Sequence, residues 1–244
     1  MNIATSRQAV PRRVGNATDT AGNTATCSFV ITVVDSTPPT ITCPANITQD
    51  NDAGVCSAVV TFSLPGGADN CTVDTVVVSS GLASGSVFPV GITTENLTVS
   101  DIAGNTASCS FTITVNDTLA PTAQCQHATV HLDAGGAVST SSPAIDHGSS
   151  DACGIDTIVL SQNSFGCSEI GTNPETLTVT DMHGNTATCG ATITVVDTVS
   201  PTITCPANIT QGNDAGLCSA VVTFATPSGV DNCAGQTVTL SVGL

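Results

Sequence analysis

The sequence predicts an all-β chain of small β-sandwiches in tandem, each held closed by disulfides. At 112–115 and 192–195, Thr alternates with Ile or Val, which is the period of a half-buried strand. Gly, Pro, Asn and Asp interrupt the chain roughly every eight to twelve residues, as in sandwich proteins. Twelve cysteines accompany only six Phe and no Trp or Tyr. Each core is therefore small and needs covalent support.

Internal repeats set the domain boundaries. TCPANITQ occurs at 42–49 and 204–211, and D-x-x-GNTA-[TS]-C occurs three times, at 19–27, 101–109 and 181–189. A motif V-[NV]-D-[ST]-x-x-P-T marks each boundary, at Asp35, Asp117 and Asp197. These positions predict two complete modules, 35–116 and 117–196.

The two remaining segments, 1–34 and 197–244, read as the late and early halves of one further module. Two interpretations stay open. In the first, a long array is cut or numbered from an arbitrary point. In the second, 1–34 of one subunit completes the open sandwich formed by 197–244 of the next. Such a contact joins different surfaces head to tail, so it would propagate as a filament.

Charge and cysteine content bound the partners and the location. Three basic residues stand against nineteen acidic ones, for a formal net charge of −16, which argues against nucleic acid or an anionic membrane as partner. No apolar run is long enough to span a membrane. The start of the chain lacks the apolar core of a secretion signal, so we expect that signal to lie elsewhere or to have been removed. Cysteine usage predicts an extracellular or cell-surface location.

Four motifs of 35–116 resemble the hyalin-repeat (HYR) family. They are Thr42–Ala45, Asp69–Cys71, Phe88–Gly91 and Asp101–Phe111. Family members are immunoglobulin-like Greek-key sandwiches in extracellular adhesive proteins, so the resemblance implies adhesion or scaffolding and identifies no ligand.

The second module departs from that pattern. Gln126 replaces the family's proline, Gly136 stands where a cysteine is expected, and Cys167 is additional. This module resembles variant repeats of large secreted bacterial surface proteins. At the N-terminus, 1–18 matches poorly because it lacks the FPVG element.

The immunoglobulin-like topology that the resemblance implies brings certain cysteines together. It pairs Cys43 with Cys109, Cys125 with Cys189, and Cys27 with Cys205. Each of the first two bridges would contribute roughly 4 kcal/mol in the chain-entropy picture. Cys27 and Cys205 lie in different halves of the split module, so their bridge would join two subunits if strands are exchanged.

Two pairings stay open for the other six cysteines. Pairing within modules gives 56–71, 153–167 and 218–233, and it is favoured because cysteines are lost and gained there together. Pairing between modules gives 56–153 and 167–233, with 218 bound to 71 of another subunit. All six are expected in disulfides: Cys56, Cys71, Cys153, Cys167, Cys218 and Cys233.

Aspartates gather at the predicted module junctions. Three carboxylates near one point repel one another unless a hard cation compensates, so calcium is a candidate ligand. The alternative is that each Asp caps its own turn. The candidate calcium ligands are Asp35, Asp69, Asp101, Asp117, Asp151, Asp181, Asp197, Asp231 and Asp19.

Catalytic motifs are missing from the sequence. All four histidines, His127, His131, His147 and His183, fall in one module, and neither G-x-S-x-G nor H-E-x-x-H occurs. We therefore predict no enzyme activity and no cofactor other than calcium. The favoured function is a structural subunit of an extracellular filament or surface array, with copies of itself as partners. The alternatives are a cell-adhesion array that binds a glycan or protein, and an accessory region of a secreted enzyme.

Overall fold

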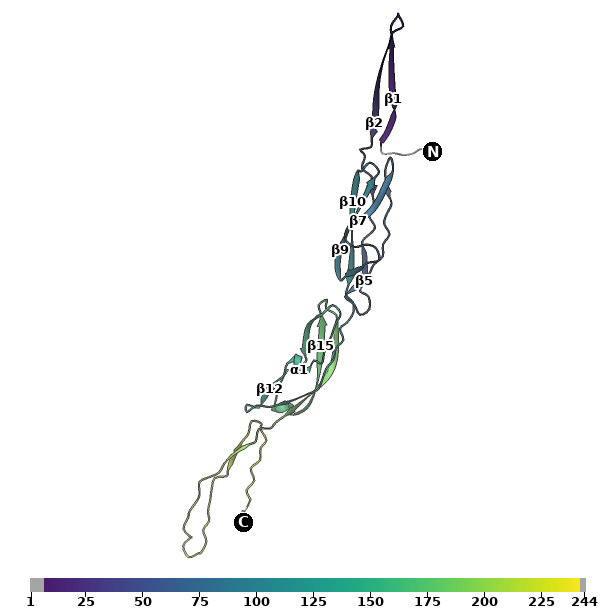
Figure 1. Cartoon of the computed structure of the whole chain (residues 1–244). Coiled ribbons are helices and arrows are strands. Elements are labelled where there is room, and N and C mark those ends of the chain that lie inside the picture. The colour runs from purple at the N-terminus through teal and green to yellow at the C-terminus, as the bar shows by residue number, and fades with distance from the viewer. Residues whose placement is uncertain (1–6, 242–244) are drawn as a thin grey trace. The chain divides into compact units, whose positions relative to one another are not determined.

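The computed structural model describes residues 7–241, which fall into two compact units, Met1–Leu119 and Ala120–Leu244. Each unit contains one sandwich with a four-stranded sheet and one additional segment (Figure 1). The two units are described one at a time below.

The additional segment of the first unit is a long hairpin. Strand β1 (Arg7–Thr18) pairs antiparallel with β2 (Thr24–Val34) in a sheet of two strands. Asp19 closes the turn, because its Oδ1 accepts hydrogen bonds from the backbone of Ala21 and Asn23. Among the described residues, no third strand joins this sheet (Figure 1).

The sandwich of the first unit has one four-stranded sheet and two short strand pairs. The sheet has the order β4-β10-β9-β7, with β4 (Ile47–Asp50), β7 (Val73–Ser80), β9 (Gly91–Asp101) and β10 (Thr106–Asn116). Strand β4 runs parallel to β10, and the other neighbours are antiparallel. The short pairs are β3 (Thr40–Ile41) with β6 (Gly67–Ala68), and β5 (Ser57–Val59) with β8 (Val87–Pro89).

Alternation along β10 places its apolar residues in the core. Phe111, Ile113 and Val115 are at most 3 % exposed, and the residues between them are only half-buried. They pack against Phe88 and Leu97. Burying each such side chain is worth roughly 1.5–3 kcal/mol, so a few residues carry this core.

The sandwich of the second unit repeats the same plan. Its sheet has the order β11-β16-β15-β13, with β11 (Ala128–His131), β13 (Ile155–Leu160), β15 (Gly171–Asp181) and β16 (Thr186–Val196). Strand β12 (Ala137–Ser139) pairs with β14 (Ser164–Gly166), followed by a 3-10 turn η1 (Cys167–Glu169), and a one-turn helix α1 (Ser142–Ile145) buries Ile145.

The rest of the second unit is a segment with little regular structure. Only β17 (Thr202–Thr204) and β18 (Ser228–Val230) pair within its described part. Its other described residues form turns and extended loops (Figure 1). The prediction of an all-β fold of tandem, disulfide-stapled sandwiches is confirmed.

A buried carboxylate supports the first sandwich. Glu95 is fully buried on β9, and both of its oxygens lie 2.9 Å from the backbone nitrogen of Leu82, which donates to them. The preceding residue, Gly81, has a φ of +108°, and a Cβ there would overlap the Glu95 carboxylate. Glycine is therefore required at this position for two separate reasons, the backbone angle and the close approach.

Replacing Gly81 with alanine should lower the melting temperature more than replacing Gly91. Both glycines have a positive φ, +108° and +116°, but nothing lies within 4 Å of a Cβ at Gly91. In both variants the backbone angle lowers the free energy of unfolding by about 1–2 kcal/mol. In Gly81→Ala, overpacking against Glu95 lowers it by roughly a further 1–3 kcal/mol. Thermal unfolding by circular dichroism measures the difference. Equal losses in the two variants would contradict the close packing of Glu95.

Candidate assembly interface

Two disulfides tie the first strand of each sandwich to its central hairpin. Cys43 bonds to Cys109 of β10, with a Cα separation of 5.7 Å. In the second unit Cys125 bonds to Cys189 of β16, with a Cα separation of 5.9 Å. These are the pairs that the immunoglobulin-like topology implies.

A third bridge corrects the pairing that the sequence favoured. Cys167 bonds to Cys233, with a Cα separation of 5.5 Å, so neither 153–167 nor 218–233 forms. Cys153 precedes β13 and Cys167 follows β14, so a strand of about 20 Å separates them. Cys71 is free, which also excludes 56–71. Cys56 and Cys153 are both disulfide-bonded.

Four cysteines are free in a single copy of the chain, although the sequence placed all twelve in bridges. They are Cys27, Cys71, Cys205 and Cys218, and all four are exposed. Cys27 lies on β2 opposite Gly15, whose missing side chain leaves the sulfur uncovered on that side. An exposed thiol that lacks a partner within its own chain is available to a second chain.

The hairpin β1–β2 exposes the same apolar face that β10 buries. In β2 the series is Phe29, Ile31 and Val33, which are 56 %, 43 % and 56 % exposed. In β10 the matching series, Phe111, Ile113 and Val115, is 3 %, 1 % and 1 % exposed. Both strands carry cysteine two residues before phenylalanine. The difference is therefore in what covers the strand.

The segment 197–241 is exposed in a complementary way. Val222 is 44 % exposed, whereas Val60, its counterpart in the repeated CSAVVTF sequence, is 1 % exposed. Ile203, Ile209 and Phe224 are also exposed. Soluble proteins seldom leave an apolar face of this kind uncovered.

Charge is distributed unevenly between these two exposed segments. All three basic residues of the chain, Arg7, Arg12 and Arg13, lie in β1. The hairpin contains a single acidic residue, Asp19, and every other acidic residue lies beyond it. The hairpin is thus the one positively charged segment of a strongly acidic chain.

The acidic residues predicted at the first junction come together only in part. One carboxylate oxygen of Asp35, one of Asp69 and the Cys71 sulfur all lie within 4.8 Å of one another. A hydrogen bond with Asp35 raises the pKa of the Cys71 thiol above its ordinary value, and desolvation and the charges of Asp35, Asp69 and Asp101 raise it further. Asp69 Oδ1 is shielded from solvent and accepts no hydrogen bond from the described residues.

Other predicted calcium ligands close their own turns instead. Burial acts to raise the pKa of Asp101 and of Asp181, but hydrogen bonds from Asn105 and Asn185 and from the turn backbone outweigh it, so both pKa values lie below the ordinary value. Asp19 has the same role in the hairpin, where the hydrogen bond from Asn23 lowers its pKa. The turn-capping interpretation applies to these three residues.

The remaining predicted ligands are Asp117, Asp151, Asp197 and Asp231, and in the second unit one carboxylate oxygen of Asp151 lies within 4.8 Å of one of Asp181. Asp117 Oδ1 accepts a 2.9 Å hydrogen bond from Asn51, and Asp151 Oδ1 accepts one from the backbone of Cys153. Asp197 Oδ1 accepts from Val199 and from Asn232, while Asp231 Oδ1 has no partner among the described residues. Asp19 belongs to the other unit from Asp197 and Asp231.

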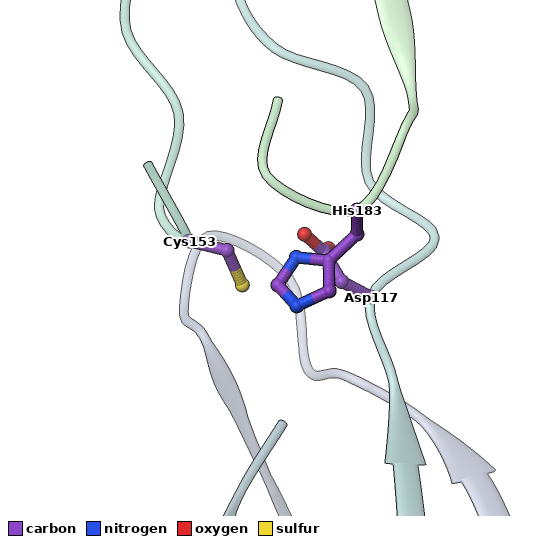
Figure 2. Close-up of side chains that lie close together, drawn as sticks. All are labelled: Asp117, Cys153 and His183. Carbon is purple, nitrogen blue, oxygen red and sulfur yellow. The ribbon is translucent and has the colours of Figure 1, made fainter. Parts of the chain in front are cut away.

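Cys153 and His183 lie close together in the second unit. Cys153 comes from the loop before β13 and His183 from the β15–β16 turn, and Figure 2 shows their side chains. Asp117, also drawn there, belongs to the first unit. The Cys153 sulfur is in a disulfide, so it offers no thiolate to a metal. This pair is therefore a structural contact.

Comparison with known proteins decides the family. The family model described as HYR domain matches residues 34–115 and 196–244, which is more than half of the chain. The chain belongs to the HYR domain family. The structure of this HYR protein contains no helix, among its described residues, that is long and apolar enough to cross a membrane.

Two curated relatives of this HYR chain are sea-urchin proteins named hyalin. That of Strongylocentrotus purpuratus is 36 % identical over 222 residues, which is 87 % of this chain and 18 % of the relative. That of Lytechinus variegatus is 39 % identical over 112 residues, covering 44 % of this chain and 21 % of the relative. The HYR chain thus spans about a fifth of their length. The bacterial attribution of the family resemblance is not borne out.

Solved structures similar to the HYR chain include protocadherin ectodomains. Protocadherin gammaB7 EC3-6 matches with a TM-score of 0.35 and 16 % identity, over 92 % of this chain and 68 % of that one. Human mucin-like protocadherin EC1-2 matches with a TM-score of 0.36 and 12 % identity, over 63 % and 96 %.

The capping aspartates predict an acid-dependent loss of stability. Asp181 Oδ1 accepts from the backbone of His183 and of Asn185, and its Oδ2 accepts from the Asn185 side chain at 2.8 Å. Because its pKa is lower in the folded state, its contribution is present above about pH 4, the ordinary value, and disappears as pH falls through the folded pKa. Asp181→Asn should therefore lower the melting temperature at pH 7 and much less at pH 2. A pH-independent difference would contradict this role.

Proposed function

We propose that this HYR chain is a structural, adhesion-type subunit of extracellular material, and that its copies join head to tail. The hairpin β1–β2 of one copy completes the sandwich that segment 197–241 of the preceding copy leaves open. The observation that carries the proposal is the exposed series of Phe29, Ile31 and Val33, whose counterparts in β10 are buried. The hairpin supplies the late strands of a sandwich and segment 197–241 supplies the early strands, so the two together make one complete module.

Strand pairing within the first sandwich gives the expected register. Ile113 and Val115 of β10 lie opposite Ile47 and Gln49 of β4 in parallel. The repeated sequences place Ile31 and Val33 of one copy opposite Ile209 and Gln211 of the other. Cys27 would then meet Cys205 as Cys109 meets Cys43, which makes this bridge a covalent link between copies.

Charge complementarity favours a second copy as the occupant. Arg12 and Arg13 are exposed on β1, and the surface that they would meet belongs to a strongly acidic chain. Opposite charge steers association and favours one register over others. A strongly acidic polymer would otherwise repel its own ends.

The disulfides support a location outside the cytoplasm. Bridges such as Cys43–Cys109 and Cys125–Cys189 persist in oxidising compartments and are rare in reducing ones. The core of each sandwich is small, so these bridges are needed for the fold to last in such a location.

Assembly should depend on the buried face of β2 and not on its other face. Ile31→Glu places a charge where the proposed sandwich is closed, which costs several kcal/mol, so assembly should fall by more than about tenfold. Val30→Glu is the matched control, because Val30 is the counterpart of Thr112, which lies outside the core cluster. Light scattering and electron microscopy measure assembly in the Cys27→Ser/Cys205→Ser background, which removes that covalent link and leaves the bridges within each sandwich intact.

The outcomes separate the proposal from its alternative. Head-to-tail joining predicts regular fibres from the unaltered chain and from Val30→Glu, and single particles from Ile31→Glu. The proposal is overturned if the unaltered chain stays monomeric at high concentration. Its open faces would then be covered by neighbouring modules of a longer polypeptide.

We further propose calcium as a ligand of the first junction. Asp35 and Asp69 place carboxylate oxygens within 4.8 Å of each other, and Asp69 Oδ1 has no donor among the described residues. Oxygen donors of this kind suit Ca²⁺, which would offset the repulsion between the two charges. Bound calcium would stiffen the link between the hairpin and the first sandwich.

Millimolar calcium should raise the melting temperature of the unaltered chain, because a ligand that binds only the folded state stabilises it. Asp69→Asn should reduce that rise, since one charge is lost while an oxygen remains to accept from the Cys71 backbone. Asp74→Asn, at an exposed position, is the control and should keep the full rise. Scanning calorimetry with calcium and with chelator tests this, and no calcium-dependent shift in any variant would exclude the site.

A further inference from the structure

We propose that a second disulfide, Cys71 to Cys218 of the preceding copy, locks each junction between neighbouring copies. This inference rests on the head-to-tail assembly proposed above and deepens it. The docking surface is the loop 69–71 of the first sandwich, and its occupant is the turn 213–218 of a second copy.

The tripeptide Asp-Asn-Cys occurs in two different environments in this chain. Asp-Asn-Cys stands at 231–233 and at 69–71. At 231–233 it is docked: Cys233 is 7 % exposed and bonded to Cys167. Asn232 Nδ2 donates to the Asp133 carbonyl and to Asp197 Oδ1, both at 3.1 Å.

The docked loop lies very close to the turn that receives it. Gly136, with a φ of +75°, closes this turn, and a Cβ there would lie 2.7 Å from the Asn232 carbonyl oxygen. The Cys167 sulfur also lies 3.5 Å from that oxygen. In the second unit, the turn 133–136 of the sandwich and the loop 231–233 of the following segment are thus joined by close contacts as well as by the Cys167–Cys233 disulfide.

The same tripeptide at 69–71 has none of these partners. Asn70 and Cys71 are exposed, the Cys71 thiol is free, and Asn70 Nδ2 donates only to the Cys71 sulfur among the described residues. Asp35 Oδ1 accepts from the Thr37 backbone, and Asp35 Oδ2 has no hydrogen-bond partner among the described residues. The loop therefore matches the docked loop in sequence and lacks only the turn that would cover it.

The turn 213–218 has the features of the missing occupant. Its sequence, NDAGLC, repeats the NDAGVC of 51–56. Asn51 Nδ2 donates to Asp117 Oδ1 at 2.9 Å, and Asn51 Oδ1 accepts from the Thr118 backbone. Asn213 Nδ2 donates only to the carbonyl of Leu217 in its own turn, among the described residues.

The boundary aspartates connect the loop 69–71 with the turn 213–218. Asp35 has the same place in its boundary motif as Asp117. When β1–β2 of one copy completes the sandwich of another, the turn 213–218 comes to Asp35 as the turn 51–56 comes to Asp117. Asn213 then donates to Asp35 Oδ1 as Asn51 donates to Asp117 Oδ1, and Cys218 is brought to Cys71.

Closing the bridge requires an oxidant of the disulfide class, such as oxidised glutathione. One of the two thiols, as thiolate, attacks the glutathione disulfide and releases one glutathione thiol. The other then attacks the mixed disulfide and releases the second. The net change is two cysteine thiols and one disulfide to one cystine and two glutathione thiols, so electrons and protons balance.

Mass spectrometry of mixed copies tests the bond directly. Chains labelled with ¹⁵N are mixed with unlabelled chains in reduced glutathione, which keeps exposed thiols free and leaves structural bridges intact. The mixture is allowed to assemble, oxidised with glutathione disulfide, and digested with pepsin at low pH to prevent exchange. We expect a Cys71–Cys218 linked peptide pair that carries both labels. In Cys27→Ser/Cys205→Ser, a non-reducing gel should still show a ladder of multimers, and adding Cys71→Ser and Cys218→Ser should abolish it.

A charge pair tests the recognition as well as the bond. Asn213→Asp removes the amide donor and sets a carboxylate against Asp35, so formation of the Cys71–Cys218 bond should slow several-fold. Gly212→Asp is the matched control: it adds the same charge one residue away, at the position that Asp50 occupies in the first sandwich. Its rate should stay close to that of the unaltered chain.

The results distinguish this inference from the assembly on which it rests. Regular fibres in electron micrographs without any linked Cys71–Cys218 peptide would overturn the second bridge and leave head-to-tail joining intact. A linked pair in which both peptides always carry the same label would mean a bond within one chain and would also overturn it. Failure to form fibres and linked peptides together would overturn both proposals.

Discussion

The scarcity of apolar bulk constrains everything else in this protein. With six Phe and no Trp or Tyr in 244 residues, each sandwich has a small core to which one strand contributes three alternate buried residues. In the first sandwich that strand is β10, and Cys109 on it holds the first strand through Cys43. Burial and the bridge act at the same place. A strand with this pattern but without a cover, such as β2, therefore leaves much of the available stabilisation unrealised.

The sequence predicts the strands from local pattern, and it predicts the closing bridges from the immunoglobulin-like topology that the family resemblance implies. Alternation of Thr with Ile or Val at 112–115 marks β10, and that topology brings Cys43 to Cys109. The buried acid Glu95 was not predicted, since only the fold brings the Leu82 backbone to it. The bridge from Cys167 to Cys233 was placed second for a related reason: short sequence separation favours local pairing, but a rigid strand between two cysteines prevents it.

The candidate interface illustrates where local sequence stops being informative. Asp-Asn-Cys at 69–71 and at 231–233 is one sequence in two environments, exposed in the first and docked in the second. Comparing repeats could have found the signal, because Phe29 and Phe111 share a motif and differ in exposure. The cluster of arginines in β1 was equally visible in the sequence, and its meaning depends on the hairpin that the structure places there. What a repeat contacts is decided by its neighbours.

The bridge between Cys43 and Cys109 also determines how the first sandwich responds to tension. Tension along the chain passes from Cys43 directly to Cys109 on β10, because the bond bypasses the loop between them, which includes β4. The 66-residue separation between the bonded cysteines corresponds to roughly 220 Å of extended chain, at about 3.3–3.6 Å per residue. None of that length can be released while the bond is intact. The module therefore behaves as an inextensible tether, and mechanical work is dissipated only in the short stretches outside the loop.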